Sequence, residues 1–194
     1  IIVYGEGCVA IKEIMEGRDL VKIEGLVYKR RKIITTSLRN SILNLDSLPF
    51  PDYSQINLDD YRSHFFTEKT MGLILSTGCN HNCIFCFVWK IFNGKNRLRS
   101  SQNILAEIEL LNKKYGIKNI NFYDQFFTVF EKRFTNICSK LKNLKINWDI
   151  ATRIDGITEK KIKIMKQSGC KSIFFGIESG NQRVLDLIRK KITL

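Results

Sequence analysis

Residues 71–87 read MGLILSTGCNHNCIFCF. The apolar run at the start predicts a strand, and three of the chain's six cysteines follow in the loop after it, at Cys79, Cys83 and Cys86. Thiolates are soft ligands that suit zinc or iron–sulfur clusters. A structural zinc ion needs four closed ligands, usually from two well-separated cysteine pairs, whereas three thiolates on a four-iron cube leave one iron open. The stretch therefore predicts a metal site with an open coordination position.

The other candidate ligands near this loop are weaker. His81 lies two residues from both Cys79 and Cys83, which is cramped for a fourth ligand, so we expect an exposed loop residue there. Cys138 and Cys170 fall on a predicted helix face and just before a predicted strand, where a buried apolar thiol is the ordinary interpretation. Metal binding is therefore expected from the three-cysteine loop.

Apolar runs that predict strands recur after the cysteine loop, with helical patterns between them. The strands are expected at residues 71–75, 117–123, 146–151 and 171–177. The helices are expected from apolar stripes and caps, at Ile104, Leu105, Ile108 and Leu111 behind Ser100 or Ser101, at Phe130, Phe134, Ile137 and Leu141, and from Thr158 to Gly169. This alternation predicts an α/β fold of about four right-handed βαβ units with a parallel sheet. The cysteine loop then lies at the carboxyl edge of the sheet, where such folds bind ligands.

The chain before this core predicts a separate N-terminal piece and a linker. Residues 1–17 read as a strand, a Gly5-Glu6-Gly7 turn and a short helix, and residues 23–36 read as a hairpin. Pro49 and Pro51 hold the backbone extended and exclude a helix. We expect an N-terminal piece over 1–47, a linker over 48–70 and an α/β core over 71–194, and we interpret both ends of the chain as cuts in a longer protein.

Charge and composition limit the class of protein. The chain has 32 Lys+Arg against 19 Asp+Glu, a net charge of +13, but the lysines are scattered and only KRRK at 29–32 is compact. Nucleic-acid binding is therefore not favoured, because a charge balance alone is a weak signal. The sequence contains neither the roughly 20 apolar residues of a membrane span nor the basic start of a signal peptide. Six unevenly spaced cysteines argue against a secreted disulfide scaffold, so we expect a cytoplasmic protein.

The spacing Cys-x3-Cys-x2-Cys after the first strand, with the aromatic Phe85 before the third cysteine, resembles the radical SAM (S-adenosylmethionine) superfamily. Further segments, in the same order along the chain, resemble its subfamily with an N-terminal cobalamin-binding domain: VYGEG, LDSLPFPDY, RLRS, NFYDQFFT, WDIATRID and GCKSIFFGIESGNQRVL. The resemblance covers essentially the whole chain. It implies a partial (β/α)6 TIM-like barrel, preceded by the tail of a Rossmann-like cobalamin-binding domain.

The resemblance also assigns roles to residues at the strand ends. It implies that Cys79, Cys83 and Cys86 bind a [4Fe-4S] cluster whose open iron is chelated by SAM. Four further residues are implied to contact SAM: the Phe85 backbone at the adenine edge, Asp124 near the ammonium group, Arg153 at a carboxylate (that of SAM or of Glu178), and Glu178 at the ribose hydroxyls. Gly78 and Arg99 are expected to support the cysteine loop. Without the resemblance, Asp124 reads as a loop cap, Arg153 with Asp155 as a surface pair, and Glu178 as a solvated residue.

The chain departs from the family pattern at a few positions. Gln125 stands where relatives often have a second aspartate, and Thr77 and Asn80 stand where they often have arginine and proline. Cys8 occupies a position that is often glutamate, and we expect it to be a small buried thiol. Neither His64 nor His81 is positioned to supply the cobalt ligand, so the cobalamin site is expected mostly outside this chain.

The resemblance implies an enzyme that cleaves SAM reductively to a 5′-deoxyadenosyl radical, with methyl transfer from cobalamin to an unactivated carbon of a small molecule as the favoured reaction. An electron donor such as flavodoxin or ferredoxin is implied as a partner. Two alternatives stay open: a radical SAM enzyme that performs RNA methylthiolation, rearrangement or cyclisation, and a zinc-binding nucleic-acid module. The zinc module leaves the βαβ series unexplained.

Overall fold

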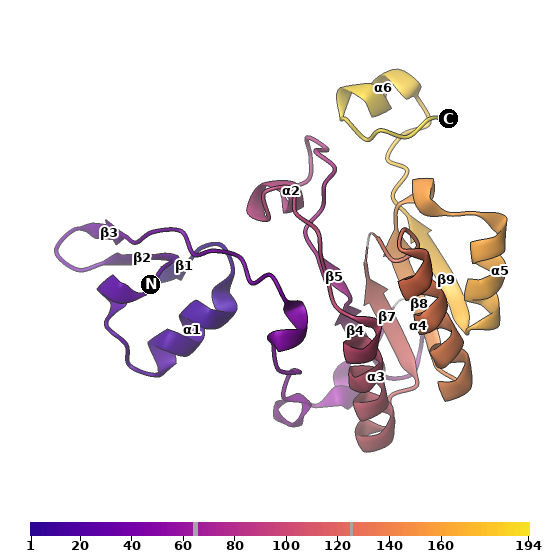
Figure 1. The fold of residues 1–194 in the computed structure, drawn as a ribbon, viewed down its shortest axis with the longest axis horizontal. Coiled ribbons are helices and arrows are strands. Elements are labelled where there is room, and N and C mark those ends of the chain that lie inside the picture. The colour runs from indigo at the N-terminus through magenta and orange to yellow at the C-terminus, as the bar shows by residue number, and fades with distance from the viewer. Residues whose placement is uncertain (64–65, 125) are drawn as a thin grey trace.

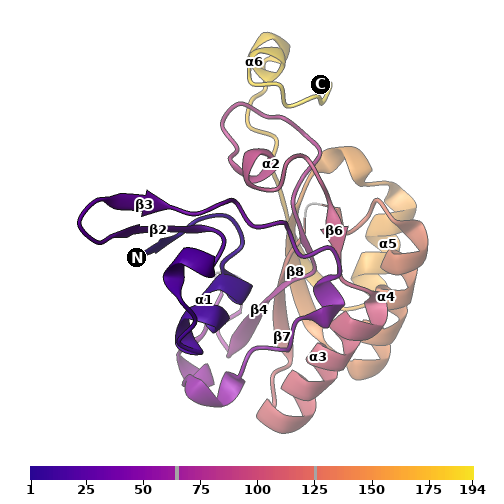
Figure 2. The same ribbon diagram turned by 60° about the vertical axis from the view of Figure 1, so that its left-hand side comes forward.

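The structure is a computed structural model that describes residues 1–63, 66–124 and 126–194. A small N-terminal unit and a larger α/β core lie at opposite ends of an irregular linker (Figure 1). In a view turned by 60°, α3, α4 and α5 still lie side by side, and the N-terminal unit still lies apart from them (Figure 2). Among the described residues, no helix has the length and apolar character needed to cross a bilayer.

The core is built on a parallel sheet of four strands in the order β4-β7-β8-β9. The strands are β4 (Thr70–Ile74), β7 (Asn119–Tyr123), β8 (Asn147–Thr152) and β9 (Cys170–Phe175), and the connecting helices are α3 (Ser101–Tyr115), α4 (Glu131–Leu144) and α5 (Glu159–Gln167). A short α6 (Gln182–Leu187) follows β9. This arrangement confirms the predicted α/β alternation and the four strands.

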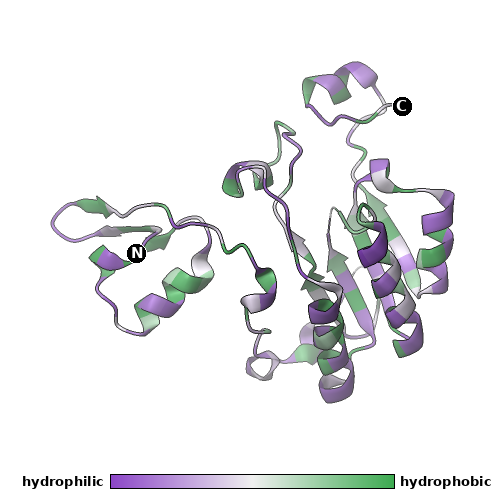
Figure 3. Cartoon of the chain, viewed as in Figure 1, coloured by the Kyte–Doolittle hydropathy of each residue, from purple (hydrophilic) through white to green (hydrophobic). Residues whose placement is uncertain are grey.

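The helices form where the sequence predicts because caps and apolar stripes coincide. The Ser100 hydroxyl accepts the Asn103 N–H at 3.1 Å at the start of α3, and Thr158 accepts the Lys161 N–H at 3.3 Å at the start of α5. The stripes of α3 and α4 pack on the sheet with Phe122, Phe127 and Trp148, whose rings lie 5.4 to 5.9 Å apart. Phe130 departs from its predicted stripe, because it lies before the first turn of α4 and is exposed. Figure 3 shows hydrophilic residues on the outward sides of these helices.

The other face of the sheet carries two rows of side chains that run across the strands. Strand register places Ile74, Tyr123, Ala151 and Phe174 side by side in one row. The next row towards the amino ends of the strands holds Gly72, Asn121, Asp149 and Ser172. The side chains of the first row are exposed and line one side of a pocket. The carboxyl edge of the sheet therefore presents an apolar wall towards the cysteine loop.

The N-terminal unit is an antiparallel sheet of three strands packed against one helix. Its elements are β1 (Ile2–Val3), α1 (Gly7–Met15), β2 (Leu26–Lys29) and β3 (Ile33–Thr35). The β2–β3 pairing confirms the predicted hairpin, and the core of the unit is formed by Ala10, Ile23, Leu26 and Tyr28. The division of the chain into the three predicted domains remains a prediction.

The linker reaches the core through a buried polar contact. After Pro49 and Pro51 the chain forms short 3-10 turns, and the Tyr53 hydroxyl donates to Glu107 on α3 at 2.5 Å. Burial and this carboxylate raise the pKa of Tyr53. The neutral phenol therefore anchors the linker to the first helix of the core through a buried hydrogen bond.

Candidate cofactor site

The cysteine loop is held at its base by a short antiparallel ribbon. The strands β5 (Ser76–Thr77) and β6 (Arg97–Leu98) pair with each other, and the loop between them contains α2 (Val88–Ile91). Gly78 opens the loop with φ +84°, and a Cβ at this position would stand 1.9 Å from the Lys95 carbonyl oxygen. Only glycine fits here, because both the backbone angle and the available space exclude a side chain. The turn before Cys79 therefore requires glycine, and the supporting role of Gly78 in cluster binding remains a prediction.

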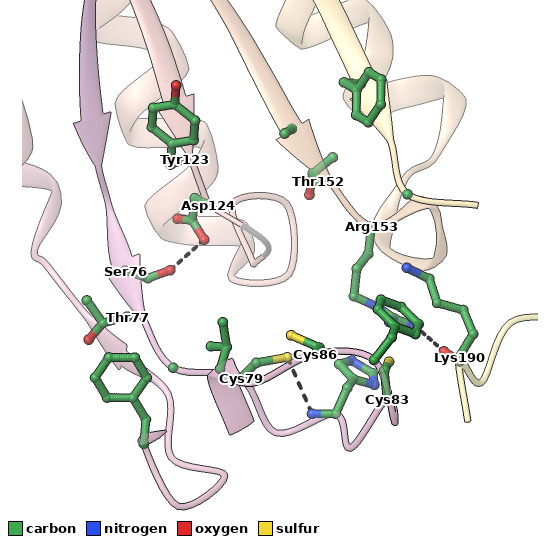
Figure 4. A pocket seen from close by; sticks show the side chains of 18 of the residues that line it. Ser76, Thr77, Cys79, Cys83, Cys86, Tyr123, Asp124, Thr152, Arg153 and Lys190 are labelled. Atoms are coloured by element: carbon green, nitrogen blue, oxygen red, sulfur yellow. Dashed lines mark hydrogen bonds between the residues drawn. The ribbon is translucent and has the colours of Figure 1, made fainter. Parts of the chain in front are cut away.

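The three cysteines line one pocket of about 500 Å³ at the carboxyl edge of the sheet. Figure 4 shows their sulfur atoms across the pocket from the ends of the strands. Cys79 and Cys83 are buried, and Cys86 is half-buried. Burial raises the pKa of the Cys79 thiol and the nearby Cys86 and Cys83 thiols raise it further, whereas the His81 N–H that bonds its sulfur at 3.4 Å lowers it. The structure thus brings together the three side chains that the spacing grouped.

The chemistry of this donor set fits a multi-iron cluster. Among the described residues, no group of three or more His, Cys, Asp or Glu side chains is arranged to hold a single metal ion. A cube-shaped cluster makes a different demand, because each thiolate binds its own iron atom at a separate corner. Three thiols around one pocket meet that demand.

Asp124 follows β7, and both of its carboxylate oxygens accept hydrogen bonds from other residues. Its Oδ1 accepts the Ser76 hydroxyl at 2.7 Å and the Phe126 N–H at 2.8 Å. Its Oδ2 accepts from Arg133 on α4 at 3.0 Å. These contacts go beyond a loop cap, since they tie Asp124 to the strand that leads into the cysteine loop. The predicted contact with the SAM ammonium group remains a prediction.

Arg153 follows β8 and forms a bidentate pair with Asp155, with Nε–Oδ1 at 2.8 Å and NH2–Oδ2 at 2.9 Å. The pair named in the alternative interpretation is therefore formed, but only Asp155 is exposed: Arg153 is buried and also donates to the Lys190 carbonyl at 2.8 Å. Burial opposes ionisation of Asp155, but the hydrogen bond and charge of Arg153 lower its pKa below the ordinary value. The guanidinium charge also acts on Cys79 and Cys83. Of the two carboxylates expected for Arg153, that of Glu178 is not its partner here, because Glu178 pairs with Lys190, and the contact with the SAM carboxylate remains a prediction.

Glu178 follows β9 and pairs instead with Lys190, whose Nζ donates to Oε1 at 2.9 Å. Glu178 has φ +72°, a backbone angle that is uncommon outside glycine. A Cβ on Gly176 would lie 2.9 Å from Glu178 Oε1 and 3.1 Å from Lys190 Nζ, so glycine leaves room for the pair. The Lys190 ammonium also lies 5.9 Å from the centre of the Phe85 ring, which is 54% exposed. The described geometry therefore gathers Phe85, Glu178 and Lys190 on one wall of the pocket.

Arg99 lies directly after β6, next to the base of the cysteine loop, and its expected supporting role remains a prediction. It pairs with Glu107 on α3 at 2.6 Å and donates to the Ile74 carbonyl at 3.0 Å, at the end of β4. Since Glu107 also accepts from Tyr53, one buried carboxylate joins the linker, α3 and the ribbon. The contact with the loop is indirect, through the strand that precedes it.

Several sequence expectations need correction or fall outside the structure. His81 is not an exposed spacer, because it is half-buried and stacks on Phe126 with ring centres 6.0 Å apart. Cys8 is exposed, not buried, since it lies in the first turn of α1. Cys138 is a buried apolar thiol, and burial raises its pKa to about 12. Gln125 and His64 lie outside the described residues.

Sequence reasoning missed three basic residues that organise the site. Arg133 holds Asp124, Lys190 holds Glu178, and Arg97 pairs with Glu6 of the N-terminal unit at 2.6 Å. Each lies on a different element from its acidic partner. No sequence pattern marks these three residues, because they are spread among 32 Lys+Arg residues and none adjoins a predicted strand.

Comparison with known proteins supplies a family for this fold and site. A family model described as the radical SAM superfamily matches residues 73–194. An uncharacterized methyltransferase of Pyrococcus horikoshii is 36% identical over 200 residues, which cover 99% of this chain and 43% of the relative.

Two solved structures share the fold. The radical S-adenosylmethionine methyltransferase TsrM from Kitasatospora setae, described with cobalamin and a [4Fe-4S] cluster bound, aligns with a TM-score of 0.66 at 15% identity, over 95% of this chain and 38% of TsrM. The cobalamin-dependent S-adenosylmethionine radical enzyme OxsB aligns with a TM-score of 0.70 at 20% identity, over 99% of this chain and 30% of OxsB. The chain thus spans less than half the length of each protein compared here.

Proposed function

This chain belongs to the radical SAM superfamily, whose family model covers residues 73–194, and from that premise we propose that Cys79, Cys83 and Cys86 bind a [4Fe-4S] cluster and that the protein cleaves SAM reductively. The observation that carries the proposal is the grouping of these three thiols in one pocket at the carboxyl edge of a parallel sheet. A cluster held by three thiolates keeps one iron without a protein ligand, where the amino and carboxylate groups of SAM can bind.

When bound, a cluster of this kind supplies the electron for cleavage of SAM into methionine and a 5′-deoxyadenosyl radical. The residues of this chain are proposed to bind the cluster and to orient SAM. Phe85 and Glu178, on the Lys190 wall of the pocket, are proposed to contact the adenosine part of SAM. Arg153 is proposed to face the carboxylate of SAM, since a guanidinium is a strong partner for a carboxylate.

We assign Asp124 a narrower role than the family pattern suggests. Its carboxylate already accepts from Ser76, Phe126 and Arg133. The carboxylate charge, paired with Arg133, lies at the edge of the pocket that Asp124 lines. Asp124 would attract the SAM ammonium group by this charge while it fixes the strand before the loop.

For the reaction, we propose cobalamin-dependent methyl transfer to an unactivated carbon of a small molecule. The support is the methyltransferase name of the P. horikoshii relative and the cobalamin in the descriptions of TsrM and OxsB. We further propose a cytoplasmic location and an electron donor of the flavodoxin or ferredoxin type. RNA methylthiolation and radical rearrangement or cyclisation without methyl transfer remain the alternatives within the superfamily.

The test is the fate of SAM under anaerobic conditions. The full-length protein with a reconstituted cluster is mixed with SAM and dithionite, and the products are measured by mass spectrometry. We expect 5′-deoxyadenosine and methionine from the wild type and from Cys8→Ser, whose exposed thiol lies outside the pocket, but not from Cys83→Ser. Equal product from Cys83→Ser would reject the ligand assignment.

A second measurement addresses methyl transfer. With SAM carrying a deuterated methyl group and added cobalamin, we expect labelled methylcobalamin to form. If SAM is cleaved but cobalamin is never methylated, the alternatives without methyl transfer replace the present proposal.

A further inference from the structure

A buried ion pair joins the N-terminal unit to the cysteine loop. Arg97, on β6, pairs with Glu6 through NH1 and Oε1 at 2.6 Å, and the two side chains are 4% and 17% exposed. The residues are 91 positions apart in sequence and belong to different parts of the molecule. A pair of this burial is costly to break, because the remaining charge is left in a poorly solvated place.

On the N-terminal side, Glu6 is fixed by two segments. It is the residue that precedes α1, so its backbone is set by the start of that helix. Its Oε2 accepts the Ile42 N–H at 2.6 Å, while Arg97 donates to the Ile42 carbonyl, also at 2.6 Å. Glu6 and Arg97 thus bind the backbone N–H and the carbonyl of the same residue, Ile42. The ion pair is therefore anchored to α1 and to the chain that leaves the N-terminal unit.

On the loop side, Arg97 reaches the residues that shape the cysteine loop. It is the cross-strand partner of Thr77, immediately before Gly78. Its guanidinium lies 4.9 Å from the centre of the Phe92 ring. The Phe92 Cβ stands 3.2 Å from where a Gly78 Cβ would be, and Phe92 lines the pocket with the cysteines. Phe92 therefore lies between the Arg97 guanidinium and the turn that precedes Cys79.

We propose that the Glu6–Arg97 pair positions the cysteine loop, so that contact with the N-terminal unit holds residues 78–96 in the conformation that accepts the cluster. Arg97 and Glu6 are positioning residues, since they act through Phe92 and Gly78 and not on the cluster itself. This inference rests on the proposed cluster binding for its meaning, but the ordering of the loop can be measured without a cluster.

The experiment is hydrogen–deuterium exchange on the full-length protein without a cluster, followed by cluster reconstitution. The variants are Glu6→Gln, which removes the charge at constant size, and Arg97→Lys, which keeps the charge but removes the guanidinium that lies over the Phe92 ring. The control is Glu13→Gln, which breaks the Arg39–Glu13 pair inside the N-terminal unit, where the side chains are 16% and 13% exposed. Thermal unfolding of every variant shows whether it folds.

In both test variants we expect exchange in residues 78–96 to rise by about tenfold or more, and the iron content after reconstitution to fall. Glu13→Gln should leave both unchanged. Unchanged exchange in folded Glu6→Gln and Arg97→Lys would overturn the inference. If the wild type binds no cluster, the proposed function fails, and the exchange result still decides whether the pair orders the loop.

Discussion

Arg133 donates to Asp124 across the gap between α4 and the end of β7, with NH1 3.0 Å from Oδ2. The side chain of Asp124 is fully buried and that of Arg133 is 10% exposed. The same guanidinium donates to the Leu75 carbonyl at 2.7 Å and the Arg99 carbonyl at 3.1 Å. One arginine therefore ties the helix behind the sheet to both strands that lead into and out of the cysteine loop.

Replacing Asp124 with asparagine should destabilise the core strongly. Asparagine keeps the shape, but Arg133 loses its counter-charge in a buried place, which typically costs about 3–5 kcal/mol. The measurement is the free energy of unfolding from urea denaturation. The matched control is Glu109→Gln in the exposed Glu109–Lys113 pair, which should cost about 0–1 kcal/mol. A loss for Asp124→Asn no larger than that of the control would contradict the account of this pair.

Replacing Gly78 with alanine should abolish cluster binding while the sheet stays folded. The new methyl group would stand 1.9 Å from the Lys95 carbonyl, so the turn before Cys79 must move. The control is Gly94→Ala in the same loop, which also has positive φ but nothing within 4 Å of its Cβ. Iron content after reconstitution and the circular dichroism spectrum check the two parts of the prediction. Similar iron loss in both variants would contradict the prediction, because it would mean that the positive backbone angle, and not the clash with the Lys95 carbonyl, prevents cluster binding.

Replacing Lys190 with methionine should weaken SAM binding. Glu178 would lose its partner and Phe85 its nearby cation, so the wall proposed to hold adenosine is no longer fixed. We expect the dissociation constant to rise about tenfold, equivalent to about 1.4 kcal/mol. Anaerobic isothermal titration calorimetry measures it, with Lys163→Met at the exposed Glu159 pair as the control. An unchanged constant would remove Lys190 from the site.

Replacing Asp149 with asparagine should stabilise the protein in a pH-dependent way. Burial on β8 raises the pKa of Asp149 from 3.8 to about 6, and the Ser63 hydroxyl at 3.5 Å opposes this only in part. Below pH 4 both states hold the proton. Between pH 4 and 6 the unfolded chain releases it first, so the free energy of unfolding contributed by this group falls as pH rises.

Asparagine cannot titrate, so the Asp149→Asn variant does not lose this free energy of unfolding as the pH rises. The variant should therefore gain about 1–3 kcal/mol over the wild type at pH 7.5 and little at pH 4. Denaturation curves at the two pH values test this. A difference that does not change with pH would show that ionisation of Asp149 is not the cause.

The sequence was sufficient for the strands, the helix caps and the cysteine loop, because periodicity, Ser100, Thr158 and cysteine spacing act locally. It was not sufficient for the ion pairs. Arg153 was expected at the carboxylate of SAM or of Glu178, with a surface pair to Asp155 as the alternative. It pairs with Asp155, and Glu178 pairs with Lys190, which no local pattern indicated. Partner choice depends on side-chain reach and on how helices rotate against the sheet. Those quantities are set by packing over the whole core and leave no local pattern.

The central claim is that three thiols hold a cluster with one iron open for SAM. The most direct measurement is electron paramagnetic resonance of the anaerobically reconstituted, reduced full-length protein with and without SAM, alongside iron and sulfide analysis. We expect about four iron and four sulfide per chain, and a cluster signal that changes when SAM is added. A colourless protein that binds zinc, or an iron–sulfur signal that SAM leaves unchanged, would contradict the claim.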